Sequence, residues 1–399
     1  MARINASCFS VRIFFLSGSL LPSMEASSVG VVRMCEALAR CGHDVSLFAR
    51  HNGVDDASAV LGRYGVETEF RLLLLGHAVT HQELGGRGSG FDKKIHYPLA
   101  VRRALKRLPA PDLLYGRHLY TMLLAALTLP KTPLVYELHE VRGNRGMRWA
   151  ERWLFRHRSF LGATAVCESV IADYRRLYPD ISDLDLFLAR NGADVPCAKL
   201  QGAEVGGRPG ARRCGYVGSL FPGKGMETVA ALAARLTEID FHVVGGSGAD
   251  LADWRARTGA LDNLIYHGFV DNARVPAYLA AMDVLLAPPR PVMRSVNGRK
   301  FGMWQAPLKI FQYMAAGKPI IASDLPHVRE ILQHRVTALL VPAEDMDAWA
   351  TALRELEDPG LTERLKAAAH ADLVQRFTWT EKAKAVTGYI SQRSKRLAL

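Results

Sequence analysis

The sequence of 399 residues lacks any apolar run long enough to cross a membrane as a helix. Its cysteines also lack zinc-like spacing. The six cysteines are Cys8, Cys35, Cys41, Cys167, Cys197 and Cys214. Scattered thiols are typical of a reducing compartment, so we expect a cytoplasmic protein. Residues 11–21, VRIFFLSGSLL, have a short apolar core that leads into a strand–loop–helix pattern, which indicates a first strand rather than a signal peptide.

Acidic residues are outnumbered by basic ones, and the net charge is +12. Such a balance suits nucleic acid, an anionic membrane surface or phosphate-bearing ligands. The basic residues gather in 93–108, 142–159 and 392–397, each with apolar residues at roughly helical spacing. Solvated helix faces explain these segments about as well as a membrane-surface patch does, so both interpretations stay open.

The order of elements predicts an α/β chain with two doubly wound halves. Strands at 11–17 and 43–49 flank a helix at about 29–40, with Ser28 as its N-cap. This opening is typical of a parallel sheet. The pattern restarts after the Gly- and Pro-containing segment 196–211, with a strand at 212–219 and a helix at 223–236.

These patterns predict four segments along the chain. They are an N-terminal Rossmann-like domain at 1–195, a linker at 196–211, a second Rossmann-like domain at 212–375, and a C-terminal helix at 376–399 that packs back on the first domain. Ligands of doubly wound sheets bind at the carboxyl ends of the strands. We therefore expect functional residues directly after strands.

Two helix starts in the second half have features of phosphate sites. In GYVGSLFPGKGME, residues 215–227, a strand and a Gly-bearing turn precede Lys224 at a helix start. The turn lacks Walker spacing, so it is weak evidence alone. In residues 305–319, Pro307 suits a first helical position and Lys309 lies in the first turn. Gln312 either leans toward this helix start or lines the core.

In the first half, His139 ends the predicted strand PLVYELHE. A catalytic and a structural role are about equally supported for this histidine. Glu140 and Arg117 hold similar positions after strands.

An ordered series of segments resembles the retaining glycosyltransferases of family 4. The segments are ALARCGHDVSLFA, YELHE, RNGADV, GYVGSLFPGKGME, HGFV, AAMDVLLAP and PLKIFQYMAAGKPIIASDLPHVREIL. The resemblance covers about residues 11–390. It implies the GT-B fold, with two Rossmann-like domains facing a central cleft. It also implies transfer of a sugar from a nucleotide diphosphate sugar, with no metal or other cofactor and with retention of configuration.

The resemblance implies roles for individual residues. The expected catalytic residues are His139, which would touch the transferred sugar, and Lys224 and Lys309, which would contact the diphosphate. The expected donor-binding residues are Gly218, Ser219, Gly245, Gly246, Phe269, Val270, Leu308, Gln312 and Arg299. The expected acceptor-side positions are Ala26, Ser27, Ser28, Arg117 and Glu140.

The sequence departs from the family pattern at several positions. The two glutamates common in the family fall on Trp304 and Gln312, and Ser219 replaces a common arginine. Small residues at 26–28 replace a double glycine. A glutamine amide can still bind a sugar hydroxyl, and Arg294, Arg299 and Lys300 offer replacement charge.

We therefore expect a glycosyltransferase of surface glycan synthesis. Its partners would be a nucleotide sugar, a glycan or polyprenyl-linked acceptor, and an anionic membrane in peripheral contact, with no nucleic acid. The sequence shows no dedicated nucleophile, which favours front-face transfer assisted by the leaving phosphate. Two alternatives stay open: a non-catalytic binding or scaffold protein, and a sugar-nucleotide epimerase.

Overall fold

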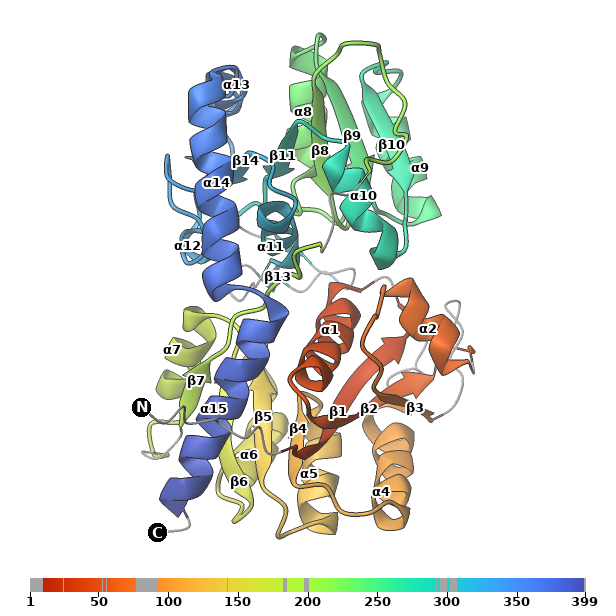
Figure 1. The fold of residues 1–399 in the computed structure, drawn as a ribbon, viewed down its shortest axis with the longest axis vertical. Coiled ribbons are helices and arrows are strands. Elements are labelled where there is room, and N and C mark those ends of the chain that lie inside the picture. Colours follow the sequence, from red (N-terminus) through yellow and green to blue (C-terminus); the bar gives the residue numbers. More distant parts are fainter. Residues whose placement is uncertain are drawn as a thin grey trace, which may run out of the picture. The chain divides into compact units, whose positions relative to one another are not determined.

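The computed structural model describes residues 10–23, 25–51, 53–54, 56–76, 92–141, 143–181, 185–196, 201–291, 293–294, 300–301 and 307–397. The chain forms two compact units. Unit 1 comprises residues 1–190 and 379–399, and unit 2 comprises residues 191–378 (Figure 1). The chain thus leaves unit 1 at Arg190 and returns to it at Trp379, where the sequence predicted boundaries at 195 and 375.

Unit 1 is built on a seven-stranded parallel sheet with the order β3-β2-β1-β4-β5-β6-β7. The strands are β1 Arg12–Leu21, β2 Asp44–His51, β3 Arg71–Leu75, β4 Leu113–Gly116, β5 Leu134–Leu138, β6 Phe160–Ala165 and β7 Leu186–Leu188. Most residues of the central strands are buried, as expected for a sheet covered on both faces. This strand order is that of a Rossmann-like sheet.

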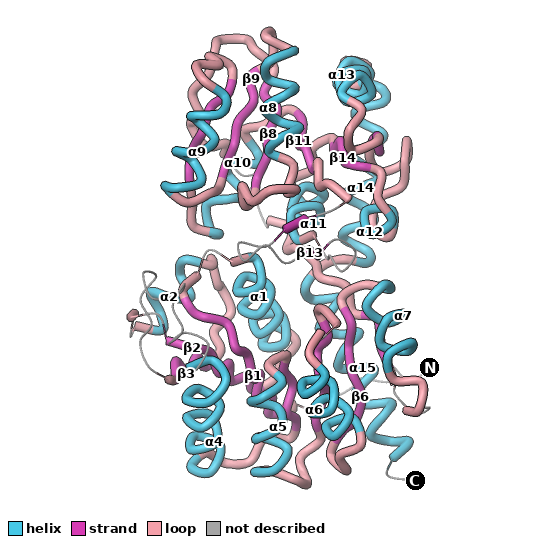
Figure 2. The backbone as a smooth tube through the Cα atoms, turned by 180° about the vertical axis from the view of Figure 1, so that it is seen from behind, coloured by secondary structure: helices cyan, strands magenta, loops and turns pink. Residues whose placement is uncertain are grey.

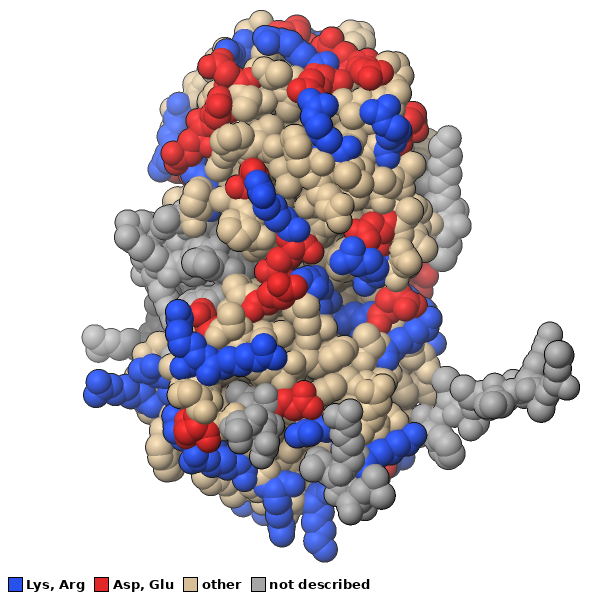
Figure 3. Space-filling model, turned by 90° about the vertical axis from the view of Figure 1, so that its left-hand side faces the viewer, with Lys and Arg blue, Asp and Glu red and all other residues tan. Residues whose placement is uncertain are grey.

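Helices cover both faces of this sheet. They are α1 Ala26–Arg40, α2 Ala57–Arg63, α4 Tyr97–Arg107 after a π-helical turn at Asp92–His96, α5 Leu119–Thr128, α6 Arg145–Phe155, α7 Glu168–Leu177 and α15 Trp379–Leu397. Helices α1 and α15 pack together on one face, and α4, α5 and α6 lie side by side on the other (Figures 1 and 2). On the side drawn in Figure 3, many lysine and arginine side chains lie on the surface of unit 1.

The start of α1 corrects the sequence prediction. The helix begins at Ala26 after Glu25, three residues before the predicted start. Ser28 is therefore not the N-cap. It lies inside the first turn, fully buried, and its hydroxyl donates to the backbone oxygen of Leu20 at 3.3 Å.

Unit 2 repeats the architecture with a six-stranded sheet of order β10-β9-β8-β11-β14-β15. The strands are β8 Arg213–Val217, β9 Asp240–Val244, β10 Leu264–Gly268, β11 Val284–Ala287, β14 Ile320–Ser323 and β15 Leu339–Val341. All pairings in this sheet are parallel. A separate antiparallel pair joins β12 Met293–Arg294 to β13 Lys300–Phe301.

Two buried clusters form the core of unit 2. The helices that contribute to them or flank them are α8 Met226–Arg235, α9 Gly248–Thr258, α10 Val275–Ala280 after a 3₁₀ turn at Asn272–Arg274, α11 Leu308–Ala315, α12 Pro326–Arg329, α13 Met346–Glu355 and α14 Pro359–Arg376. Helix α11 begins at Leu308, so Pro307 is its N-cap residue rather than its first helical residue. None of the helices described in either unit is long and apolar enough to span a bilayer.

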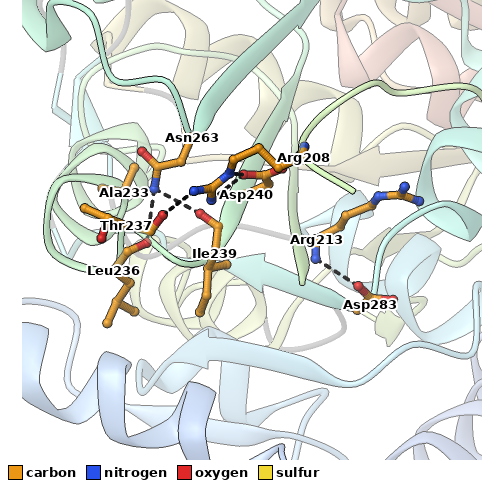
Figure 4. Close-up of polar contacts among 9 residues, drawn as sticks. All are labelled: Arg208, Arg213, Ala233, Leu236, Thr237, Ile239, Asp240, Asn263 and Asp283. Carbon is orange, nitrogen blue, oxygen red and sulfur yellow. Dashed lines mark hydrogen bonds and ion pairs between the residues drawn. The ribbon is translucent and has the colours of Figure 1, made fainter. Parts of the chain in front are cut away.

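Polar contacts at the amino end of the second sheet are largely satisfied within the protein (Figure 4). The buried carboxylate of Asp240 accepts hydrogen bonds from the backbone and side chain of Arg208. The amide of Asn263 lies 2.9–3.1 Å from three backbone oxygens in the segment 233–239. The backbone N–H of Arg213 donates to Asp283 at 2.8 Å. Structural contacts thus occupy the amino edge of this sheet, and ligands of doubly wound sheets bind at the opposite, carboxyl edge.

Candidate functional site

The candidate donor site lies where the strand order of the second sheet reverses. Strands β8 and β11 are neighbours there, and the chain continues from β8 to β9 and β10 on one side and from β11 to β14 and β15 on the other. The crevice at such a switch point is the usual ligand site of a doubly wound sheet. The turn that follows β8 contains Gly218, Ser219 and Lys224, three of the predicted site residues.

Two glycines allow the loops at this edge to approach closely. A β-carbon at Gly245 would lie 2.1 Å from the backbone oxygen of Gly218, and Gly245 has φ of +125°. A β-carbon at Gly225 would lie 2.3 Å from the backbone oxygen of Pro288, with φ of +106°. Only glycine fits such positions without moving the backbone. The turns after β8, β9 and β11 are therefore held against one another.

Two tyrosines fix the turn after β8 and the start of α11. The hydroxyl of Tyr216, which is buried, lies 2.6 Å from the backbone oxygen of Ser219 and 3.1 Å from that of Lys224. The hydroxyl of Tyr313 on α11 accepts from the backbone N–H of Val217 at 2.9 Å. Buried hydroxyls bonded in this way hold the turn after β8 in place and join α11 to the end of β8 before any ligand binds.

Lys309 brings a basic side chain to this turn. Its Nζ lies 3.9 Å from the centroid of the Tyr216 ring, and a β-carbon at Gly218 would come within 2.9 Å of it. This nitrogen is buried and has no hydrogen-bond partner among the described residues, although part of the side chain is exposed. Burial and the charge of Lys224 hold the pKa of Lys309 well below its usual value. Burial also lowers the pKa of Lys224.

The remaining donor predictions fall along the same edge or outside the described residues. Gly246 follows β9, and a β-carbon there would meet the Leu220 side chain at 2.5 Å. Phe269 follows β10 and is 45% exposed, while Val270 packs against the core. Two further donor predictions, Leu308 and Gln312, are partly exposed on α11. Four positions named in the sequence analysis lie outside the described part of the structure: Arg299, Trp304, and the side chains of Arg294 and Lys300.

His139 lies directly after β5 in unit 1 and is held by Glu137. One oxygen of Glu137 contacts His139 Nε2, and the other accepts from the Tyr115 hydroxyl at 2.5 Å. The ammonium of Lys382, from α15, lies 3.5 Å from this second oxygen. The side chains of Glu137 and Lys382 are 5% and 3% exposed, so this is a buried ion pair.

The electrostatics of this cluster keep the histidine neutral. Burial is the largest cause that lowers the pKa of His139 to about 4, and Arg117 adds to it. Burial raises the pKa of Glu137. The positive charge of Lys382 and the contact between Glu137 and His139 lower this pKa by more, so it lies well below its usual value. The carboxylate therefore accepts from Nε2–H, which leaves Nδ1 of His139 as an acceptor.

The predicted acceptor-side residues are only partly brought together. The guanidinium of Arg117 donates to the backbone oxygen of Ser27 at 3.3 Å, and its charge reaches His139. Ala26 is exposed at the start of α1, but the hydroxyl of Ser28 is buried and engaged. The backbone oxygen of Glu140 accepts from Tyr174 at 3.2 Å.

Several residues of the two sites were not predicted from the sequence. Glu137 and Lys382 are far apart in sequence and come into contact only in the folded chain. The sequence pattern around Tyr216 is that of an ordinary buried strand residue. The one available signal was the acid inside the otherwise apolar strand Leu134–Leu138. Among the described residues, no group of three or more His, Cys, Asp or Glu side chains is placed to hold a metal ion.

Comparison with known proteins agrees with this architecture. Residues 211–358 match the family model described as glycosyl transferases group 1, and residues 27–195 match the model described as glycosyltransferase family 4. Phosphatidyl-myo-inositol mannosyltransferases are similar: that of Mycolicibacterium smegmatis is 32% identical over 165 residues, and that of Mycobacterium leprae 30% over 164 residues. In both cases 40% of this chain is aligned, and the match spans about 40% of the length of these relatives.

Solved structures show the same fold over nearly the whole chain. Anabaena HepE in complex with UDP has a TM-score of 0.68 and 16% identity, and covers 96% of this chain and 100% of its own. Sucrose-phosphate synthase from Thermosynechococcus elongatus has a TM-score of 0.70 and 16% identity, with coverage of 96% and 98%. Residues 27–195 therefore form a glycosyltransferase family 4 domain and residues 211–358 a glycosyl transferases group 1 domain, and the chain has the GT-B fold.

Proposed function

We propose that this chain is a retaining, metal-independent glycosyltransferase. It moves a sugar from a nucleotide diphosphate sugar to a glycan or lipid-linked acceptor in surface polysaccharide synthesis. The observation that carries the proposal is the pair of partly buried lysines at the switch point of the second sheet, Lys224 and Lys309, of which Lys309 has no hydrogen-bond partner for its Nζ among the described residues. A diphosphate is a ligand whose charge and oxygens match them. The mannosyltransferase relatives and the UDP complex of a structural neighbour support this choice.

The residues of the site would act by positioning and by electrostatic stabilisation. The bond between the anomeric carbon and the diphosphate oxygen breaks, and both electrons remain on the diphosphate. The acceptor hydroxyl forms its bond on the same face of the sugar, and its proton passes to the leaving phosphate oxygen. Lys224 and Lys309 stabilise the charge that develops on the diphosphate, while Nδ1 of neutral His139 accepts from a sugar hydroxyl.

A panel of nucleotide sugars tests this function. Thermal shift measurements should show stabilisation by one class of nucleotide sugar and by its nucleoside diphosphate. The protein should then transfer that sugar to a lipid-linked or glycan acceptor. The transfer should retain the anomeric configuration and should proceed in the presence of a metal chelator. Binding without transfer to any acceptor would favour a scaffold role, which the glutamine at position 312 makes a real alternative. Conversion of the free donor to an isomer would favour an epimerase. No binding at all would contradict the proposal.

We also propose that unit 1 binds the cytoplasmic face of an anionic membrane. On α4, the side chains of Arg102, Arg103, Lys106 and Arg107 are exposed beside Leu99, which is 37% exposed. On the neighbouring helix pair, Leu127 of α5 and Trp149 of α6 are 60% and 70% exposed. Basic and apolar side chains mixed in this way suit the interface of a bilayer.

Replacing the four basic residues of α4 by glutamine should reduce co-sedimentation with phosphatidylglycerol-rich vesicles at low salt. Each basic residue contributes about 1 kcal/mol near such a surface, so the whole cluster is needed for a clear effect. Vesicles of neutral phosphatidylcholine, to which the parent should bind weakly, provide the control. Equal sedimentation of parent and variant with anionic vesicles would show that the basic residues of α4 form a solvated helix face and not a membrane contact.

A further inference from the structure

The carboxyl end of β14 carries polar side chains that the donor site described above does not use. Strand β14 neighbours β11, which neighbours β8, so residues after β14 lie on the same sheet edge as the Lys224 turn. Ser323 is the last residue of β14, and His327 follows in the first turn of α12. Neither residue was singled out by the sequence patterns.

His327 is buried without a hydrogen-bond partner for one ring nitrogen. The residue is 5% exposed, and its Nε2 is buried with no partner in the described part of the chain. The hydroxyl of Ser323, which is fully buried, also has none among the described residues. Buried polar atoms are normally paired, and leaving them unpaired costs stability. Unpaired groups at a ligand-binding edge point to a ligand that completes them.

Lys224 links His327 to the donor site. Burial and the charge of Lys224 together lower the pKa of His327 to about 4, and the same Lys224 charge acts on Lys309. Lys224 is therefore within electrostatic reach of both His327 and Lys309. A neutral imidazole near Lys224 can donate one N–H without adding charge. An anion with several acceptor oxygens, such as a diphosphate, is the kind of ligand that accepts from an imidazole N–H and from lysine side chains.

We propose that His327 is a further donor-binding residue whose Nε2–H donates to an oxygen of the diphosphate. The inference rests on the proposed function for the identity of the whole ligand, but the contact itself requires only a diphosphate group. His327 would then be a third diphosphate contact beside Lys224 and Lys309. It lies on α12, where the family resemblance implied no donor-binding residue.

Calorimetry with UDP, GDP and inorganic pyrophosphate tests the contact. His327→Phe keeps a ring in the buried site but removes the nitrogen, and should weaken binding of the best probe at least tenfold. His327→Gln restores an N–H at a similar distance and should stay within about threefold of the parent. His242→Phe is the matched control, because His242 is also buried with an unpartnered Nε2 but stacks on His267 in the sheet interior. It should leave affinity unchanged.

The outcomes separate this inference from the proposed function. Unchanged affinity in a folded His327→Phe protein would overturn the inference and leave the donor site intact. Pyrophosphate binding that needs His327, without binding of any nucleoside diphosphate, would support the contact and contradict the proposed donor. No binding of any probe by the parent would overturn both. If His327→Phe does not fold, nitrogen NMR of the parent protein tests the contact instead. The His327 Nε2 signal should shift when the probe binds. A signal that does not shift would overturn the inference.

Discussion

Lys309 shows how one residue can prepare a site for an anion. Its ammonium lies over the Tyr216 ring, buried and beside Lys224, so the charged form is disfavoured while the site is empty. A bound diphosphate would supply the missing negative charge and raise the pKa of Lys309 again. Binding should therefore take up protons at a pH between the pKa of the free protein and that of the complex. Within this range the affinity should fall as pH rises, because binding must protonate a lysine that is neutral in the free protein.

The first prediction concerns this proton uptake. Calorimetry with the best nucleoside diphosphate at pH 8, in two buffers of different ionisation heat, should show uptake of protons by the parent. Lys309→Met should remove most of the uptake and weaken binding at least tenfold. Lys318→Met is the control, since burial lowers the pKa of Lys318 too, but this residue follows the opposite end of α11. Equal proton uptake by the parent and by Lys309→Met would show that Lys309 does not contact the diphosphate.

Gln312 is the residue at which an active enzyme and a degenerate one are best told apart. It is partly exposed on α11, four residues from the helix start. Gln312→Glu restores the acid more common in the family. The helix start favours the new charge by about 0.3–1 kcal/mol, while repulsion from a bound diphosphate opposes it. We expect nucleotide affinity within about tenfold of the parent and no gain in transfer rate. An inactive parent that gains transfer activity through this change would show that its chemistry had been lost here.

Single residues were predictable where their role is local and not where it depends on the fold. The positions of Lys224 and Lys309 near helix starts could be predicted because turn residues precede each helix. Ser28 was misassigned as an N-cap because the helix starts earlier and its hydroxyl bonds to the preceding strand end. Glu137 was missed because its partner Lys382 is 245 residues away in sequence and joins it only through packing of α15.

Helix α15 connects the end of the chain to the centre of unit 1. Lys382 from this helix is the cation that pairs with buried Glu137, which in turn holds His139. Removing one member of a buried ion pair leaves an uncompensated charge, which typically costs 3–5 kcal/mol. An exposed ion pair on the same helix is worth only about 0–1 kcal/mol. The helix offers both cases within three residues, because Lys384 pairs with Glu381 on its surface.

We therefore predict that Lys382→Met lowers the unfolding free energy by about 3 kcal/mol, and that Lys384→Met changes it by less than about 1 kcal/mol. Urea unfolding of both variants measures the difference. The His139 signal in NMR titrations should also move to a higher pKa in Lys382→Met, because a nearby positive charge that lowers it has gone. Equal stability of the two variants would show that the buried pair contributes no more than a surface pair.

Whole elements were predicted best where apolar periodicity and turn residues agree. Strands β1, β2, β5 and β8 fall on predicted strand segments, whereas β3 and β15 were not predicted, and the helix after Lys224 begins at Met226, three residues after its predicted start. The start of α1 was wrong by three residues, since no side chain caps it. Boundaries of this kind depend on contacts with the neighbouring strand, which sequence patterns do not contain.

At the scale of the whole chain, two parallel sheets followed from the alternation of strands and helices in each half. That alternation allows few topologies, because crossover connections between parallel strands are right-handed. The strand orders of both sheets reverse at one point, which places Gly218 after β8 beside the turn that follows β11. The positions of the site loops were thus predictable, while their supporting residues, such as Tyr216 and Tyr313, were not, because they act through tertiary hydrogen bonds.

Both units carry histidines with lowered pKa values that should make the protein sensitive to acid. The pKa values of His139 in unit 1, and of His242 and His327 in unit 2, are each lowered from 6.5 to about 4, mainly by burial. Between pH 6.5 and 4 these imidazoles stay neutral in the folded protein and protonate in the unfolded chain. The unfolded state then binds more protons, so the unfolding free energy falls as pH falls through this window.

Each histidine should contribute a loss on the order of 1–3 kcal/mol across the window. We expect unfolding temperatures that change little above pH 7 and fall steadily from pH 6.5 toward pH 4, measured by calorimetry at constant ionic strength. The double variant His242→Phe/His327→Phe should show a shallower fall for the unit 2 transition, because two of the proton-binding groups of the unfolded state are gone. The unit 1 transition retains His139 and should keep its slope, which provides an internal control. A parent protein equally stable at pH 7 and pH 4.5 would contradict the assignment of neutral, buried imidazoles at these positions.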